Sequence, residues 1–188
     1  MLYAPRMLLT GSAGRNSGKT VFACDVLRRF ASEEDIVAAK VTTIQERGGA
    51  CPRGGDGCGV CSSLETDYCI TEETAKDGPK DTQRLLAAGA KRVYWLRVLK
   101  EHLEQGARAL LETIGDDHLT ICESNSLRAV VEPGLFLLFR RRQSNEFKAS
   151  AKAVRRWADR VVVFDGNRFD VDPGAICLVD GHWMMRHV

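Results

Sequence analysis

The chain alternates short apolar runs with segments whose apolar residues recur every three or four positions. Runs of the first kind are typical of strands that are buried on both faces of a sheet. They predict strands at Arg6–Thr10, Ile36–Val41, Arg92–Val98, Leu119–Cys122, Leu135–Phe139, Val161–Phe164 and Ala175–Val179. Segments of the second kind predict helices at Lys19–Phe30, Asp81–Ala88, Glu101–Ile114 and Glu146–Ala158.

The ends and faces of these helices carry further signals. Gly89 and Gly115 directly follow two of the predicted helices, at the position where a left-handed residue commonly ends a helix. The last helix has an apolar face formed by Phe147, Ala151, Val154 and Trp157.

Strands that alternate with helices predict right-handed crossovers and a mostly parallel sheet that is covered on both faces. No helical pattern precedes the run Ala175–Val179, so we expect it to finish the sheet as an antiparallel edge strand. A chain of 188 residues is long enough for one well-buried core, and a second full domain would be cramped. The pattern therefore predicts a single three-layer α/β domain over residues 1–188.

Residues 43–79 interrupt this alternation. They are rich in glycine and cysteine and show no sustained periodicity. A loop of this length inside a compact domain usually has a functional or metal-organised reason. We therefore expect residues 43–79 to be a cysteine-rich, metal-binding insertion.

Composition narrows the classes of function. The net charge of +2 does not predict the broad basic face of a nucleic-acid-binding protein. The local run Arg140–Arg142 is expected to be a solvated approach to a helix, with an anion site as the alternative. No apolar run reaches the ~18 residues that a membrane span needs. The start of the chain has too short an apolar core for a secretory signal, so we expect a cytoplasmic protein.

Residues 13–20 read AGRNSGKT and stand between a predicted buried strand and a predicted helix, the context that a phosphate loop requires. Gly14 and Gly18 are expected to allow conformations and close approaches that a Cβ would forbid. Main-chain N–H groups and the helix dipole would then face the phosphates. Lys19 would add a charge for the β and γ phosphates, and the Thr20 hydroxyl would ligate Mg²⁺. The expected nucleotide-binding residues are Gly14, Arg15, Asn16, Ser17, Gly18, Lys19, Thr20 and Lys40.

Phosphoryl transfer also needs an acidic group at the end of a neighbouring strand. Glu123 directly follows the run Leu119–Cys122 and fits this role, so Lys19, Thr20 and Glu123 are the expected catalytic residues. Asp165 ends a later strand, where an Asp-Gly-Asn turn is the competing interpretation. Lys40 ends the second strand, and both a phosphate contact and a simple surface position stay open for it.

Taken together, these segments resemble the MobB-type P-loop NTPases. The likeness rests on GSAGRNSGKT, on the strand-end lysine of IVAAKV, and on GPKDTQRLLAAGAKRV at residues 78–93. It spans roughly the first half of the chain. Glu123-Ser124 stands where the family has Glu-Gly, and the chain continues past a short core of that type.

The resemblance implies a three-layer P-loop NTPase fold and a role in the biosynthesis of molybdopterin guanine dinucleotide. By resemblance the nucleotide is GTP with Mg²⁺, although the chain has no Asn-Lys-x-Asp guanine signature, so ATP stays open. A homodimer, and a metallocofactor enzyme or assembly protein as partner, are further implications of the likeness.

Four cysteines lie in the insertion, at Cys51, Cys58, Cys61 and Cys69. Four thiolates can complete a tetrahedral Zn²⁺ site or hold a 4Fe–4S cluster. The spacing lacks the second C-x2-C of a zinc ribbon, so zinc, iron–sulfur and metal-free thiols all stay open. Three other cysteines are in apolar contexts and are expected to be small buried residues: Cys24, Cys122 and Cys177.

Two functions follow from these motifs. The first is a Mg²⁺-dependent GTP or ATP hydrolase, slow without its partner, that assists the biosynthesis or insertion of a molybdopterin-type metallocofactor. The second is a non-catalytic adaptor that binds nucleotide and docks a partner enzyme through its cysteine module. The two functions differ in whether the protein itself hydrolyses the bound nucleotide.

Overall fold

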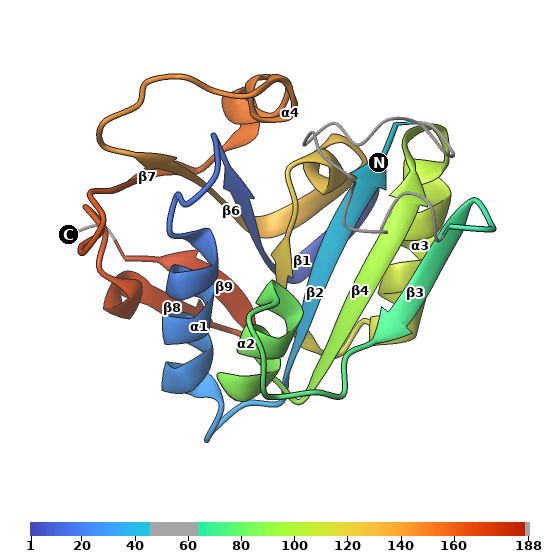
Figure 1. The fold of residues 1–188 in the computed structure, drawn as a ribbon. Helices are drawn as coiled ribbons and strands as arrows, with labels where there is room; N and C mark the ends of the chain where they lie inside the picture. Colours follow the sequence, from blue (N-terminus) through green and yellow to red (C-terminus); the bar gives the residue numbers. More distant parts are fainter. Residues whose placement is uncertain (46–63, 187–188) are drawn as a thin grey trace.

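The computed structural model describes residues 1–45 and 64–186 (Figure 1). In chain order, the described strands are β1 (Leu2–Ser12), β2 (Ile36–Ile44), β3 (Tyr68–Glu72), β4 (Arg92–Leu99), β5 (Leu119–Glu123), β6 (Val131–Arg141), β7 (Arg160–Phe164), β8 (Ile176–Val179) and β9 (His182–Met185). The α-helices are α1 (Lys19–Phe30), α2 (Asp81–Ala87), α3 (Leu103–Ile114) and α4 (Ala149–Lys152). Short 3₁₀ helices are η1 (Lys100–His102), η2 (Ser126–Ala129), η3 (Arg155–Trp157) and η4 (Pro173–Ala175).

The central sheet has the strand order β3-β4-β2-β5-β1-β6-β7 among the described residues. All neighbouring strands are parallel except β3, which runs antiparallel to β4. The predicted mostly parallel α/β sheet is therefore confirmed. The strand that leads into AGRNSGKT, β1, lies inside the sheet between β5 and β6.

Helices cover both faces of this sheet, because successive side chains of a strand point to opposite sides. Met7 and Leu9 of β1 belong to the core on the face of α3 and α4, whereas Leu8 belongs to the core on the face of α1 and α2. Figure 1 shows α1 and α2 in front of the sheet and α3 behind it. The arrangement has the expected three layers.

The prediction of one helix over Glu146–Ala158 is wrong. The backbone is helical only in α4 and η3, and Lys148 is extended, with φ −59° and ψ 157°. The N–H of Lys148 instead donates to the carbonyl of Ala13, over 2.9 Å, so this stretch is used to anchor the loop after β1. The predicted apolar face is nevertheless buried, since Phe147, Ala151 and Val154 all pack into the core.

The C-terminal segment also departs from expectation. The strand expected at Ala175–Val179 does not join the central sheet but pairs with β9 in a separate antiparallel hairpin. Asp180 and Gly181 form its two-residue turn, with φ angles of 51° and 73°, as a type I′ hairpin turn requires. Trp183 of β9 is fully buried beneath this hairpin and donates to the carbonyl of Thr120, over 3.1 Å.

Three further expectations can be compared with the described residues. Residues 46–63 of the expected insertion lie outside the described residues, but residues 68–72 form a strand where no regular structure was expected. Arg140 and Arg141 are the last residues of β6, so the expected approach to a helix is wrong there. Within residues 1–45 and 64–186, none of the helices has the length and apolar character needed to cross a membrane.

Candidate functional site

The candidate site lies at the carboxyl edge of the sheet, where β5 ends at Glu123 and β1 at Ser12. The prediction that Lys40 ends its strand is wrong, because β2 continues to Ile44. Thr10 of β1 and Lys40 of β2 are both in register with Glu123 of β5, which lies between them. Parallel pairing therefore brings together residues that are 30 or more positions apart in the chain. Open α/β sheets generally bind ligands at this edge.

The loop between β1 and α1 opens at this edge. Gly18 has a φ of 83° and Asn16 a φ of 53°, so both adopt the left-handed region. A Cβ on Gly18 would lie 2.7 Å from the ring of Phe169 and 2.8 Å from that of Phe164. The expectation that only glycine fits here is confirmed. At Gly14 a Cβ would meet no protein atom within 4 Å, so the fold itself does not require glycine there, and the expected close approach to a phosphate stays a prediction.

The loop is fixed at its start and has free donors along its length. The N–H of Ala13 donates to the carbonyl of Phe139, over 2.7 Å, and Ala13 accepts from Lys148 on the other side. From Gly14 to Thr20, the main-chain N–H groups have no hydrogen-bond acceptor in the described part of the chain. Gly14, Arg15 and Asn16 are exposed. A run of unpaired N–H groups at the start of a helix is suited to an anion.

Lys19 projects from the first residue of α1 into a group of oxygen atoms. Its Nζ pairs with Oε2 of Glu123, donates to Oγ1 of Thr20 over 3.3 Å, and lies 3.9 Å from Oδ2 of Asp81. The Lys19 side chain keeps 23% of its surface exposed, and that of Glu123 only 1%. Three of the predicted residues, Lys19, Thr20 and Glu123, are therefore brought into contact.

Lys40 joins the same cluster through Asp81. Its Nζ donates to Oδ2 of Asp81, the first residue of α2. Burial acts to raise the pKa of Asp81, but the hydrogen bond from Lys40, the charges of Lys19 and Lys40, and a hydrogen bond with Thr20 hold that pKa below its ordinary value. Positive and negative charges thus alternate from Lys40 to Glu123. We call these five residues the charged cluster: Lys19, Thr20, Lys40, Asp81 and Glu123.

Glu123 has one oxygen in this cluster and one without a partner. Its Oε1 is buried and has no hydrogen bond among the described residues. A buried carboxylate oxygen without a partner is costly, and native structures usually satisfy it with a water, an ion or a ligand. The second oxygen is therefore suited to binding a metal-bound water or a metal ion.

Sequence reasoning missed Asp81 as a site residue. Asp81 is the first residue of a predicted helix, where an acidic residue is ordinarily explained by its favourable interaction with the helix dipole. The order Lys80-Asp81 before Thr82 was visible, but the distance to Lys19 depends on how α2 packs beside α1. The contact between Asp81 and Lys19 therefore exists only in the folded protein and cannot be read from the sequence.

Asn125 is a second residue that the sequence did not indicate. Its Oδ1 accepts from the N–H of Ser12, over 2.7 Å, and its Nδ2 donates to the carbonyl of Ser12, over 2.9 Å. The same Nδ2 lies 3.1 Å from Oγ of Ser150. Asn125 therefore ties the end of β5 to the base of the loop and to α4.

Asp165, the alternative to Glu123 as the acidic group, stabilises a turn. Its Oδ1 accepts from the N–H groups of Asn167 and Arg168, both over 2.8 Å. These backbone hydrogen bonds lower the pKa of Asp165. The residue is exposed after β7, two strands away from β1, and it makes no contact with Lys19 in the described structure.

The cysteines separate into two groups. Cys51, Cys58 and Cys61 lie outside the described residues, and Cys69 is half-buried on β3, where its sulfur accepts from Arg97 over 3.3 Å. In residues 1–45 and 64–186, no group of three or more His, Cys, Asp or Glu side chains is placed to hold a metal ion. The other three cysteines are buried, as expected: Cys24, Cys122 and Cys177.

Comparisons with protein-family models, with curated proteins and with solved structures find no match to this chain. The resemblance to MobB-type NTPases therefore stays a prediction from sequence motifs. The candidate site rests on its own geometry, a loop of unpaired N–H groups beside a charged cluster.

Proposed function

We propose that the protein binds a nucleoside triphosphate with Mg²⁺ at the loop of residues 13–20 and hydrolyses it slowly. The observation that carries this proposal is the charged cluster. An ammonium, a hydroxyl and two carboxylates meet at the opening of a loop whose N–H groups have no partner among the described residues.

Each part of the cluster has a matching role in phosphoryl transfer. The loop N–H groups of residues 14–20 bind the phosphate oxygens, and Lys19 moves from its carboxylate partners to the β and γ phosphates. Lys40 is paired with Asp81 on the other side of the cluster, and we expect it to bind the same phosphates. Thr20, Asp81 and Glu123 would hold Mg²⁺ directly or through water, because oxygen ligands suit that ion. The ion would neutralise the charge on the phosphates.

Glu123 would also orient the attacking water through its unpaired oxygen. In the structure Glu123 is paired with Lys19, so it would orient the water only after Lys19 has moved to the phosphates, and this extra step favours slow turnover. The same pairing supports the second candidate function, a nucleotide-binding adaptor without catalysis of its own. Single-turnover assays with and without a partner separate the two.

The biological task is proposed from the resemblance and from the cysteines. The protein would assist the biosynthesis or insertion of a molybdopterin-type metallocofactor. Cys51, Cys58, Cys61 and Cys69 would hold zinc or a 4Fe–4S cluster. Anaerobic purification followed by elemental analysis and a visible spectrum tests this part. Stoichiometric zinc or iron with sulfide supports it, and metal-free protein contradicts it.

Nucleotide titration tests the central part of the proposal. Fluorescent ATP and GTP analogues are titrated in the presence of Mg²⁺ into wild type, Lys19→Ala and the control Lys91→Ala, an exposed lysine that pairs with Asp35. We expect saturable binding to wild type and the control, and a loss of at least about tenfold in affinity for Lys19→Ala. Equal affinity in Lys19→Ala, or no binding to wild type, would contradict the proposal.

A further inference from the structure

Residues 140–160, which we call the basic segment, hold an unusual share of the positive charge. They contain eight of the 27 Lys and Arg residues and two of the 25 Asp and Glu residues, a net charge of +6. The rest of the chain, with 19 basic and 23 acidic residues, has a net charge of −4. The small overall charge therefore hides a strongly basic region beside an acidic remainder.

Aromatic rings hold several of these cations in place. The guanidinium of Arg155 lies 4.5 Å from the ring centroid of Phe147, and that of Arg156 lies 4.4 Å from the ring of Trp157. Arg128 of η2 contacts the same Trp157 ring at 5.1 Å. A guanidinium that is stacked on a ring still has its N–H edge free for a carboxylate.

One of the two acids in the basic segment is committed to the fold. Oδ2 of Asp159 accepts from the N–H of Phe136, over 2.7 Å, so this carboxylate is used at the start of the β6–β7 pairing. Arg155, Arg156 and Lys152 are all exposed. Their charge is therefore available to a ligand.

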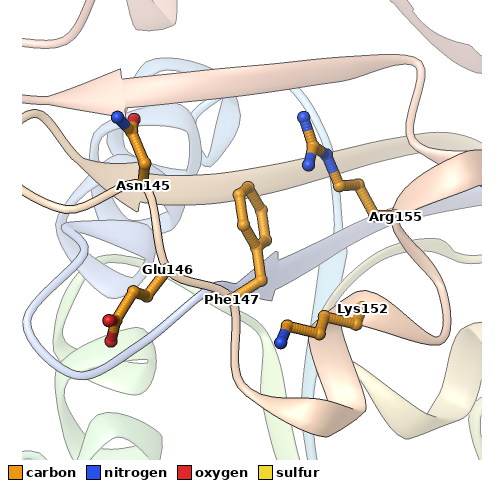
Figure 2. Close-up of a pocket in the computed structure, with 5 residues that line it drawn as sticks. All are labelled: Asn145, Glu146, Phe147, Lys152 and Arg155. Atoms are coloured by element: carbon orange, nitrogen blue, oxygen red, sulfur yellow. The ribbon is translucent and has the colours of Figure 1, made fainter.

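A cavity of about 690 Å³ opens within the basic segment. It is lined by Asn145, Glu146, Phe147, Lys152 and Arg155 (Figure 2). In Figure 2 the ring of Phe147 lies in the middle, with Asn145 and Glu146 on one side and Arg155 and Lys152 on the other. The cavity thus has two cations on one side, the carboxylate of Glu146 on the other and the mostly covered ring of Phe147 between them, and its volume is within the range of ligand-binding cavities.

We propose that the basic segment docks an acidic segment of a partner protein, with one carboxylate of the partner entering the cavity between Lys152 and Arg155. Charge complementarity carries this choice of partner. The fork of Arg155 is held against the ring of Phe147 and leaves its N–H edge for a carboxylate.

A nucleic acid fits the same surface less well. Duplex DNA carries one charge per ~1.7 Å and would extend past the basic segment onto the acidic remainder of the protein. Single strands are bound mainly by stacking of bases on exposed aromatic rings. The rings of Phe147 and Trp157 are already covered by arginine. A short acidic peptide meets neither obstacle.

The docking surface is built into the base of the phosphate loop, although the proposal does not rest on nucleotide binding. The hydrogen bond from Lys148 to Ala13 and the contact from Asn125 to Ser150 join the basic segment to the loop. A partner docked here would lie beside the candidate site.

The test uses a fluorescein-labelled octaglutamate peptide and fluorescence anisotropy at low salt. The variant Arg155→Glu/Arg156→Glu reverses two charges of the surface. The control Lys91→Glu/Arg108→Glu reverses two exposed charges elsewhere, so both proteins have the same net charge. We expect saturable binding to wild type, an affinity within about twofold of wild type for the control, and a loss of at least about tenfold for the surface variant.

A second measurement keeps the test valid if the surface variant does not fold. Amide NMR shifts of the wild-type protein are followed during the peptide titration and should change mainly within residues 140–160. Equal loss in both variants, shifts spread over the whole chain, or no saturable binding would overturn the proposal. Tighter binding of a labelled 12-nucleotide DNA through the same residues would assign the surface to nucleic acid and would also overturn it.

Discussion

At the scale of single residues, the candidate site is a balance of four charges. Lys19 and Lys40 face Glu123 and Asp81, and each ammonium contacts a carboxylate. Such partly buried pairs hold the lysines in position, and the lysines can still exchange these carboxylates for phosphates, because a triphosphate offers stronger and more numerous acceptors. Asp81 is the residue that contacts both lysines, so it is the most informative position to change.

Replacing Asp81 by Asn should separate metal binding from phosphate binding. The change removes a proposed Mg²⁺ ligand and also removes the carboxylate that competes with phosphate for both lysines. We expect nucleotide affinity with Mg²⁺ to fall about tenfold or more, and tripolyphosphate affinity in EDTA to stay equal or rise. Fluorescence titration measures the first and calorimetry the second. Asp77→Asn, in the exposed turn before α2, is the control. An equal fall in both affinities would indicate a structural role only.

The lowered pKa of Asp81 predicts a pH dependence of stability. Since the folded-state pKa is below the unfolded value of about 4, the carboxylate stabilises the fold above that pH, and the contribution is lost as pH falls through the folded value. Wild type should therefore be more stable than Asp81→Asn near neutral pH, with the difference shrinking below about pH 4. Urea unfolding across this range measures it. A difference that stays constant in acid would contradict the charge-based explanation.

At the scale of elements, the loop between β1 and α1 is shaped by the strands beside it. Ala13 is bonded to β6 and to the segment before α4, and Asn125 fixes Ser12 from β5. The bend is therefore held by three neighbours rather than by its own residues. The glycines inside it have unequal structural roles.

Alanine substitutions at Gly18 and Gly14 measure how much each glycine contributes to stability. Gly18→Ala introduces a side chain at a positive φ and against two phenylalanine rings, and should cost about 1–3 kcal/mol of unfolding free energy. Gly14→Ala meets no atom within 4 Å and should be nearly neutral. Thermal or urea unfolding of both variants gives the comparison. Equal destabilisation, or a stable Gly18→Ala, would show that the described backbone is wrong at this bend.

Much of this element plan could be predicted from the sequence. The helix Lys19–Phe30 and the buried strands were predictable because their periodicity is strong and their neighbours are turn residues. Glu123 was predictable as a strand-end acid for the same reason. Asp81 and Asn125 were not, since each acts across contacts between distant elements.

The two failures at the C-terminal end have different causes, one a contact with a distant segment and the other a local turn. The stretch Glu146–Ala158 has a helical apolar face, but the backbone bond from Lys148 to Ala13 competes with the first turn. The hairpin β8–β9 has a signal in the sequence, because Asp180-Gly181 is a residue pair that favours a two-residue hairpin turn.

At the scale of the whole molecule, the hairpin β8–β9 completes the layer formed by α1 and α2. Phe30 of α1 contacts the buried Trp183 edge-on, with ring centroids 5.5 Å apart. Phe169 packs against Phe22 and beside Gly18, so the C-terminal part of the chain reaches the loop of the candidate site. The last quarter of the chain is therefore part of the core that supports the site.

Changing Trp183 tests this support. Trp183→Phe leaves the carbonyl of Thr120 without its donor and creates a small cavity, so we expect a loss of about 1–3 kcal/mol of unfolding free energy. Met184→Ala, at the exposed neighbouring position, should stay within about 0.5 kcal/mol of wild type. Urea unfolding compares the two. Equal effects would mean that the hairpin does not belong to the cooperative core.

The most direct test of the account is amide NMR of the loop during titration with Mg²⁺ and non-hydrolysable ATP or GTP. The account predicts that the N–H signals of Gly14 to Thr20 shift downfield together and become protected from exchange, because phosphate oxygens accept their hydrogen bonds. Signals from this loop that stay unchanged while the ligand is saturating, or that change no more than those of the β8–β9 turn, would contradict it.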